Sequence, residues 1–168
     1  MSKQVHSLQR WWRHLNMTHW QLRRAFPQQA LQAITDSVRT SELLHGGEIR
    51  VAIEAELSSL NLLRGVSPRE RASQVFALLK VWDTQARNGV LIYLCLADRS
   101  VEIIADQGLQ AKVTELQWAE VCRQLQADCA AKNYQRGVCN AVAVVGQLIG
   151  VHYPVADRNE QPDRPVLL

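Results

Sequence analysis

Residues 82 to 108 constrain the fold more than any other part of the chain, because two strand-like segments follow each other there almost without a break. Residues 90 to 96 form a nearly continuous apolar run, VLIYLCL, which indicates a strand buried on both faces. Residues 101 to 105, VEIIA, are typical of a half-covered strand. Asp98, Arg99 and Ser100 lie between the two segments, as in a tight hairpin. The pattern predicts an antiparallel pair of strands.

The rest of the chain predicts one more strand and several helices. Residues 48 to 57 alternate, with Ile49, Val51 and Ile53 on one side, which predicts a strand. Ser67 and Thr114 each begin a capping box, and each therefore predicts the start of a helix. Further helices are predicted over residues 4 to 16, from Pro27 to about His45, and over residues 134 to 150; residues 58 to 66 are predicted to be a loop.

This order of elements predicts an α/β fold. A helical crossover between the first two strands makes them parallel, and the hairpin adds a third strand antiparallel to the second. We therefore expect a small mixed β-sheet flanked by helices on both faces, an α/β/α sandwich, with an extra N-terminal helix. The expected units are a basic, Trp-rich segment (residues 1–26), the α/β domain (27–154) and an extended C-terminal tail (155–168).

The positive charge of the chain is concentrated at its N-terminus. Residues 1 to 35 carry five basic and no acidic side chains, whereas the remaining residues carry 14 basic and 16 acidic ones. A cationic, Trp-rich helix could lie on an anionic membrane surface, or it could dock on the domain with its tryptophans in the interface. Nucleic acid is a weaker candidate, because five cations are few. The residues of this candidate membrane or partner surface are Arg10, Trp11, Trp12, Arg13, Trp20, Arg23 and Arg24.

No apolar stretch approaches the roughly 20 residues of a membrane-spanning helix, and polar residues interrupt the N-terminus where a secretory signal would be apolar. We therefore expect a cytoplasmic protein. Its four cysteines form no C-x-x-C pair and lie within apolar patterns, so reduced, buried thiols are expected rather than disulfides or a metal site.

Acidic side chains near the strand ends are candidate metal ligands, because calcium takes six to eight oxygen ligands. The alternative is that the aspartates cap turns and that Glu48 and Glu54 are solvated. The turn Arg87-Asn88-Gly89 could hold an anion, although turn geometry explains Asn-Gly equally well. No catalytic triad is indicated. The candidate ligands for calcium or magnesium are Asp83, Asp106, Glu48 and Asp98.

Several separated segments, between about residues 28 and 154, resemble the TPM domain family: residues 47–51 (GEIRV), 82–84 (WDT), 87–93 (RNGVLIY), 105–108 (ADQG) and 152–154 (HYP). The resemblance implies an α/β sandwich. It also implies two properties of some members, acid phosphatase activity and binding of divalent cations near the strand-end loops. The chain is similar to the short soluble branch, which is often encoded beside LemA-type membrane proteins.

Secreted members of that family often have an acidic residue where this chain has Arg87, and a guanidinium there removes an oxygen ligand and adds a repelling charge. We therefore expect a binding or accessory factor at the cytoplasmic face of the membrane. Its partner would be the anionic membrane surface or a LemA-type membrane protein. The alternative is a divalent-cation-dependent hydrolase resembling an acid phosphatase.

Overall fold

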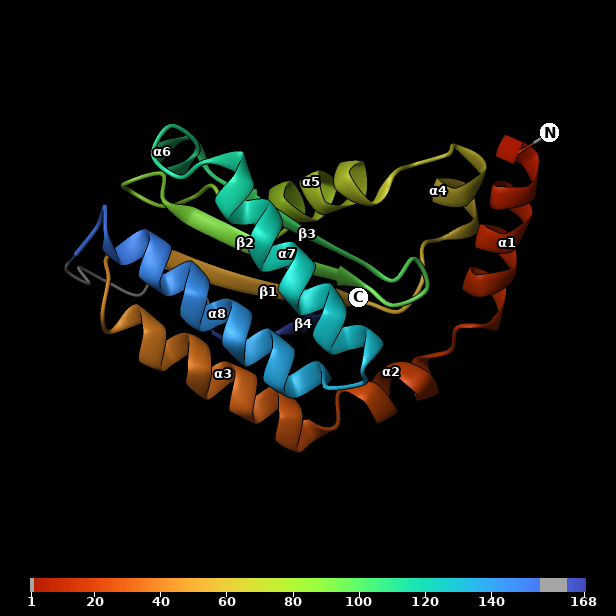
Figure 1. Cartoon of the computed structure of the whole chain (residues 1–168), viewed down its shortest axis with the longest axis horizontal. Coiled ribbons are helices and arrows are strands. Elements are labelled where there is room, and N and C mark those ends of the chain that lie inside the picture. Colours follow the sequence, from red (N-terminus) through yellow and green to blue (C-terminus); the bar gives the residue numbers. More distant parts are fainter. Residues whose placement is uncertain (1, 155–162) are drawn as a thin grey trace.

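The computed structural model describes residues 2–154 and 163–168, with side chains from residue 8 onward. The strands form a single sheet, and the helices lie around it (Figure 1). They are α1 (Ser2–Asn16), α2 (His19–Ala25), α3 (Gln28–Glu42), β1 (Glu48–Glu54), α4 (Ser59–Leu63), α5 (Pro68–Leu78), β2 (Gly89–Cys95), β3 (Ser100–Ala105), α6 (Gln107–Gln110), α7 (Glu115–Ala130), α8 (Tyr134–Gly150) and β4 (Val166–Leu167).

The sheet is mixed, with strand order β3-β2-β1-β4. β1 is parallel to β2 and to β4, and β2 is antiparallel to β3. The register pairs Glu48 with Gly89 and Val90 with Ala105, so the starts of β1 and β2 and the end of β3 lie at one end of the sheet. The predicted α/β fold is confirmed, including the parallel crossover and the antiparallel hairpin.

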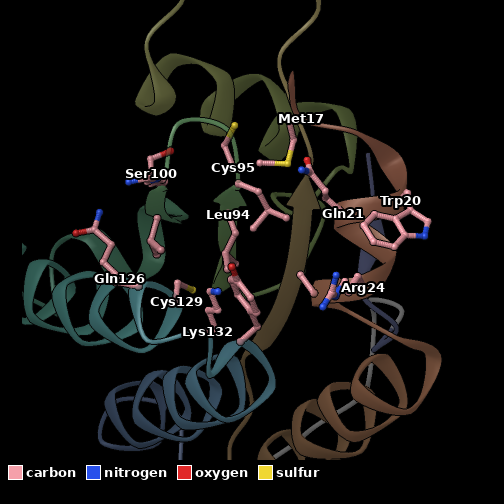
Figure 2. Close-up of a pocket in the computed structure, with 16 residues that line it drawn as sticks. Met17, Trp20, Gln21, Arg24, Leu94, Cys95, Ser100, Gln126, Cys129 and Lys132 are labelled. Carbon is pink, nitrogen blue, oxygen red and sulfur yellow. The ribbon is translucent and has the colours of Figure 1, made fainter. Parts of the chain in front are cut away.

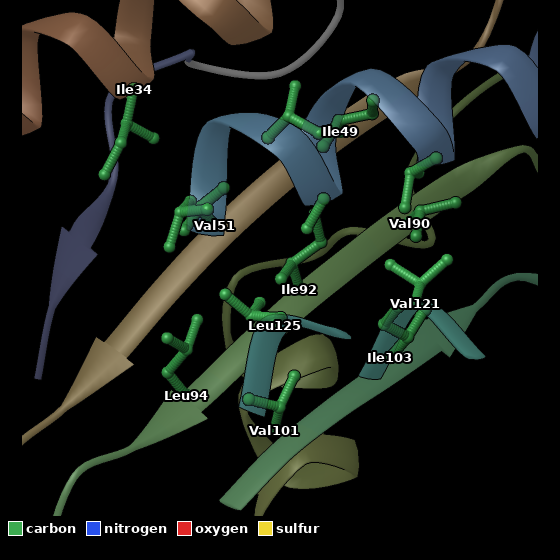
Figure 3. Packing of buried hydrophobic residues seen from close by; sticks show 14 of the residues in the cluster. Ile34, Ile49, Val51, Val90, Ile92, Leu94, Val101, Ile103, Val121 and Leu125 are labelled. Carbon is green, nitrogen blue, oxygen red and sulfur yellow. The ribbon is translucent and has the colours of Figure 1, made fainter. Parts of the chain in front are cut away.

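Helices cover both faces of the sheet. α3, α7 and α8 pack on the face that carries Ile49, Val51 and Ile53, where they form the larger apolar cluster (Figures 1 and 3). α4 and α5 lie on the opposite face, where Leu62 and Val75 pack with Leu91 and other residues in a smaller cluster. Both faces of β2 are therefore buried, as its continuous apolar run predicted.

The helix starts follow the local sequence. At Ser67 and at Thr114 both hydrogen bonds of the predicted capping boxes are present. A third capping box, between Thr18 and Gln21, begins α2, which was not predicted. Part of the predicted loop is also helical, because the Ser58 side chain accepts a hydrogen bond from the Asn61 amide and starts the short helix α4.

The C-terminal residues extend the sheet. Val166 and Leu167, within the predicted extended tail (residues 155–168), pair with Ala52 and Ile53 as a parallel fourth strand. The Leu168 amide also donates to the Ile53 carbonyl at 2.9 Å. Pairing there satisfies backbone groups of β1 that would otherwise form an open sheet edge. None of the described helices is long and apolar enough to cross a bilayer.

Candidate functional site

The predicted metal ligands lie at two opposite ends of the sheet. Glu48 begins β1, and Asp106 follows β3 with its amide bonded to the Gly89 carbonyl, so both lie at the end where β1 and β2 start. Asp98 lies at the other end, in the turn between β2 and β3. The Val90–Ala105 and Cys95–Ser100 pairs that mark the two ends are five residues apart along the strands, or about 17 Å at 3.3–3.4 Å per residue. The four carboxylates therefore do not converge on one ion. Asp83 is exposed in the loop before β2.

The Arg87-Asn88-Gly89 turn is held by its own hydrogen bonds. Asn88 is buried; its side-chain amide donates to the Gly46 carbonyl, and its backbone amide donates to the Thr84 hydroxyl at 3.1 Å. A side chain at Gly89 would collide with the Val81 carbonyl, so the close approach of two backbone segments requires glycine there. The amides that an anion would use at Arg87 and Asn88 already donate within the turn. This geometry favours the turn interpretation.

Asp106 acts mainly as a helix cap, as the turn alternative expected. One carboxylate oxygen accepts a hydrogen bond from the Gln107 amide at 2.7 Å and begins α6. Its second oxygen is buried and has no hydrogen-bond partner among the described residues. The exposed Arg87 side chain donates to the side chain of Gln107, the residue after Asp106, at 3.1 Å.

The expectation that Glu48 and Glu54 are solvated was wrong, because both are buried on β1. Both oxygens of Glu54 accept hydrogen bonds from Arg71, at 2.7 and 3.0 Å, and one also accepts from the Tyr93 hydroxyl. Burial, and then the neighbouring Cys95 and Glu54, raise the pKa of Tyr93 well above its usual range, so the phenol stays a donor. The alternation of β1 in the sequence predicts that Glu54 lies on the face opposite Ile53. It does not reveal the partners Arg71 and Tyr93, because they are 17 and 39 residues away in the chain.

Glu42, at the end of α3, is a further buried carboxyl group, and it was not identified from the sequence. It accepts a hydrogen bond from the Ile49 amide at 2.8 Å. Burial raises the pKa of Glu42 to about 9. The hydrogen bond from the Ile49 amide acts to lower this pKa, whereas the neighbouring Glu48 and Asp163 raise it further. Burial therefore favours the protonated form of Glu42. The nearby Asp163 carboxylate pairs with Arg39 at 3.3 Å, which connects the C-terminal residues to α3.

At the opposite end of the sheet, Asp98 holds α1 against the domain. Both of its oxygens accept hydrogen bonds from Arg10 at 2.8 Å, and one also contacts the His14 Nε2 at 3.0 Å. The Leu57 amide donates to His14 Nδ1 at 2.9 Å, so Nδ1 is the acceptor and Nε2 is left to donate to Asp98. Burial acts to raise the pKa of Asp98, but the hydrogen bonds from His14 and Arg10 outweigh it and hold the pKa well below its usual range.

His14, Asp98 and Cys95 form the single group of three metal-ligating residues among the described side chains. Two features argue against an ion there. The Arg10 guanidinium already occupies the carboxylate, and it would repel a cation. Burial also raises the pKa of the Cys95 thiol to about 12, so forming the thiolate that a metal needs costs free energy.

The predicted N-terminal surface is divided between the two faces of α1. Arg10 and Trp11 face the domain, with Trp11 packed against the smaller apolar cluster, so neither is available to a membrane. Leu8, Trp12 and Leu15 are 72%, 70% and 67% exposed. Their spacing places all three on one side of the helix. Four more residues of the predicted surface are exposed: Arg13, Trp20, Arg23 and Arg24.

Comparisons with known proteins agree with the architecture. The family model of the TPM domain matches residues 23–148. The NMR structure of the BA42 protein from the psychrophilic bacterium Bizionia argentinensis is 27% identical, with a TM-score of 0.70, and the match covers 83% of this chain and 93% of that one. The N-terminal domain of a protein from P. gingivalis is 19% identical, with a TM-score of 0.56 over 74% of this chain and 76% of that one, and shares the fold. No curated protein matches the chain.

Proposed function

The chain belongs to the TPM domain family, and from that premise we propose that it is a binding or accessory factor that attaches to the anionic, cytoplasmic face of a membrane through α1 and α2. The observation that carries this proposal is the exposed apolar stripe Leu8, Trp12 and Leu15. Isolated exposed apolar side chains are common on proteins, but three on one face of a cationic helix are typical of interfacial binding.

The way in which α1 is held supports the proposal. Arg10 and His14 fix the inner side of the helix to Asp98, which leaves the stripe turned away from the domain. The helix therefore keeps its apolar side exposed without unfolding or moving. α1 and α2 follow each other at one end of the molecule (Figure 1).

Charge supports the same partner. Arg13, Arg23 and Arg24 are exposed, and residues 1 to 35 contain no acidic side chain. Each basic residue near an anionic bilayer contributes about 1 kcal/mol to binding, and the attraction falls off within a Debye length of about 10 Å at 0.1 M salt. Attachment should therefore need anionic lipid and should weaken as salt is raised.

Cosedimentation with vesicles tests the proposal. We expect the protein to pellet with phosphatidylglycerol-containing vesicles and to stay in solution with pure phosphatidylcholine. Trp12→Glu should weaken binding about tenfold or more, because it removes roughly 1.5–3 kcal/mol of apolar burial. Since Trp12 is 70% exposed, the variant should keep its fold.

The matched control is Leu116→Glu, which replaces an apolar side chain that is 83% exposed in the first turn of α7. It should bind vesicles like the unchanged protein. Deletion of residues 1–24 is a weaker test, because it also removes the contacts of Arg10 and His14 with Asp98. Equal binding by the Trp12→Glu and Leu116→Glu variants, or no binding to anionic vesicles at all, would contradict the proposal.

A divalent-cation-dependent phosphatase is the second candidate function. The observation in its favour is the buried oxygen of Asp106, which has no hydrogen-bond partner among the described residues. An oxygen of this kind could bind calcium or magnesium, with other acidic groups at the same end of the sheet, such as Asp83, contributing through water. Arg87 nearby acts against a cation and in favour of a phosphate group.

The test is hydrolysis of a generic phosphomonoester with calcium, magnesium or manganese. Asp106→Asn should abolish turnover while the amide oxygen still caps α6 in place of the carboxylate. Asp83→Asn serves as the comparison, and we expect a smaller loss there. Absence of turnover above background with all three cations would remove this candidate and leave membrane attachment unaffected.

A further inference from the structure

A cavity of about 810 Å³ lies between α2 and the connection from α7 to α8, beside the last residues of β2 (Figure 2). Its volume is within the range of about 300–1,000 Å³ of small-molecule sites. Its place outside the carboxyl end of a parallel strand is where ligands bind in open α/β sheets. Neither the candidate metal ligands nor the Arg87 turn contribute to its lining.

The charges around the cavity have one sign. Arg24, Arg99 and Lys132 line it, and none of the described lining residues is acidic. Arg24 lies 5.4 Å from the centre of the Trp20 ring, which holds the guanidinium beside the opening. Asp98, the acidic residue next to Arg99, is paired with Arg10 and His14 instead. The cavity therefore attracts an anion.

Two of these cations occupy backbone positions that ordinarily favour glycine. Arg99, in the turn between β2 and β3, has φ of 53°, and Lys132, just after α7, has φ of 62°. Both values lie in the left-handed region, which is unfavourable for a residue with a side chain. Lys80 and Arg87 also have positive φ and lie outside the lining, so the attraction for an anion comes from the charge of Arg99 and Lys132 and not from their backbone conformation.

The base of the cavity is apolar. Buried Leu94 and Val101 line it together with Met17, Ala25 and Tyr134, and Figure 2 shows Leu94 in the middle of the lining residues. The hydroxyl oxygen of Ser100 is buried beside it and has no hydrogen-bond partner among the described residues. A ligand with an anionic end and an apolar body would pair with the basic side chains and cover the apolar lining together.

We propose that this cavity binds a single-chain amphiphile with an anionic headgroup. Its headgroup pairs with Arg99, Lys132 and Arg24, and its chain lies over Leu94 and Val101. A simple anion would leave the apolar base in water, and a neutral amphiphile would leave the three cations without a counter-charge. The inference does not rest on membrane attachment, which the exposed stripe of α1 carries, although Arg24 belongs to both surfaces.

Thiol alkylation gives a direct test. Cys95 and Cys129 line the cavity, and of these Cys95 is buried and Cys129 is half-buried. Cys122 and Cys139 are half-buried like Cys129 but do not line the cavity, so they are internal controls for Cys129. The probes are laurate and dodecyl phosphate below their critical micelle concentrations, with N-ethylmaleimide as the reagent and mass spectrometry as the readout. Alkylation of Cys129 should slow about fivefold or more, and the rates at Cys122 and Cys139 should not change. The stronger probe identifies the preferred headgroup.

Charge reversal makes the test specific. Arg99→Glu and Lys132→Glu should each remove the protection of Cys129, whereas Arg64→Glu, an exposed arginine after α4, should retain it. Thermal melts by circular dichroism check that the variants fold. Equal protection by inorganic phosphate or by the uncharged methyl ester of laurate overturns the proposal. Equal slowing at Cys129 and at the two control thiols, or none at Cys129, overturns it as well. Failure of vesicle binding with protection intact contradicts only the membrane proposal.

Discussion

The same strand, β1, meets two different environments. On the face covered by α3, α7 and α8 its Ile49, Val51 and Ile53 join a large apolar cluster and are at most 1% exposed (Figure 3). On the other face Glu48 and Glu54 are also buried, and Glu54 depends on Arg71 and Tyr93 for hydrogen bonds. The first face requires only apolar side chains of suitable volume, whereas the second requires particular polar partners. Stability should therefore respond to pH and to single charges mainly on the second face.

The largest expected effect is on the apolar face. Ile92→Ala should lower the free energy of unfolding by about 4 kcal/mol, because a fully buried side chain leaves a cavity between the sheet and α8. Urea titration at low and high salt measures it, and the loss should not depend on salt. Leu116→Ala, on the surface of α7, is the control, with an expected change within about 0.5 kcal/mol. If the loss of unfolding free energy in Ile92→Ala depended strongly on salt, this face would not be stabilised by apolar packing alone, and the contrast with the polar face would fail.

The second effect breaks the buried ion pair. Arg71→Met should cost about 3 kcal/mol, because it leaves the Glu54 carboxylate buried with Tyr93 as its remaining donor among the described side chains. Adding Glu54→Gln should recover part of the loss, since a neutral amide needs less compensation. A double-mutant cycle from urea titrations gives the coupling energy. Strict additivity of the two substitutions would show that the pair does not act as a unit.

The third effect concerns the attachment of α1. Asp98→Asn should lower the free energy of unfolding by about 2 kcal/mol, because it removes the carboxylate charge that strengthens the hydrogen bonds from Arg10 and His14. Because the folded pKa of Asp98 is depressed, its contribution is present above the ordinary value of about 3.9 and is lost as pH falls below it. Hydrogen exchange of the Leu57 amide, which donates to His14, reports the loss. Unchanged protection at Leu57 in the variant would contradict the docking role of Asp98.

The last effect has the opposite pH dependence. Since the pKa of Glu42 is raised to about 9, the folded state holds a proton that the unfolded state loses, and stability falls as pH rises from about 4 toward 9. Glu42→Gln still accepts the hydrogen bond from the Ile49 amide, and its stability relative to the unchanged protein should be higher at pH 8 than at pH 5. Thermal melts at pH 5 and pH 8 measure it. A variant that is equally destabilised at both values would mean that Glu42 is charged in the fold.

Much of the architecture was predictable because its signals are local. The apolar run of β2, the alternation of β1 and the capping boxes at Ser67 and Thr114 each depend on residues within a few positions of one another. β4 was not predictable in the same way. Val166 and Leu167 are too short a segment for periodicity, and they form a strand only because β1 offers an unpaired edge.

The candidate sites were less predictable, because long-range pairing decides what each charge does. Asp98 was predicted as a metal ligand and Arg10 as part of a membrane surface, yet they bind each other across 88 residues. The aromatic residues Trp11 and Trp12 are adjacent in the sequence, and only the docking of α1 determines that Trp11 packs inward while Trp12 is 70% exposed.

The α/β architecture, the family and the concentration of positive charge in the first 35 residues were all predictable from local patterns in the amino-acid sequence. The pairing of the charges and the cavity between α2, β2 and α7, by contrast, depend on the completed fold. The two kinds of feature differ in the distance over which their interactions act. Hydrophobic periodicity and helix capping act over a few residues, whereas an ion pair, a buried proton or a cavity depends on side chains that only the completed fold brings together.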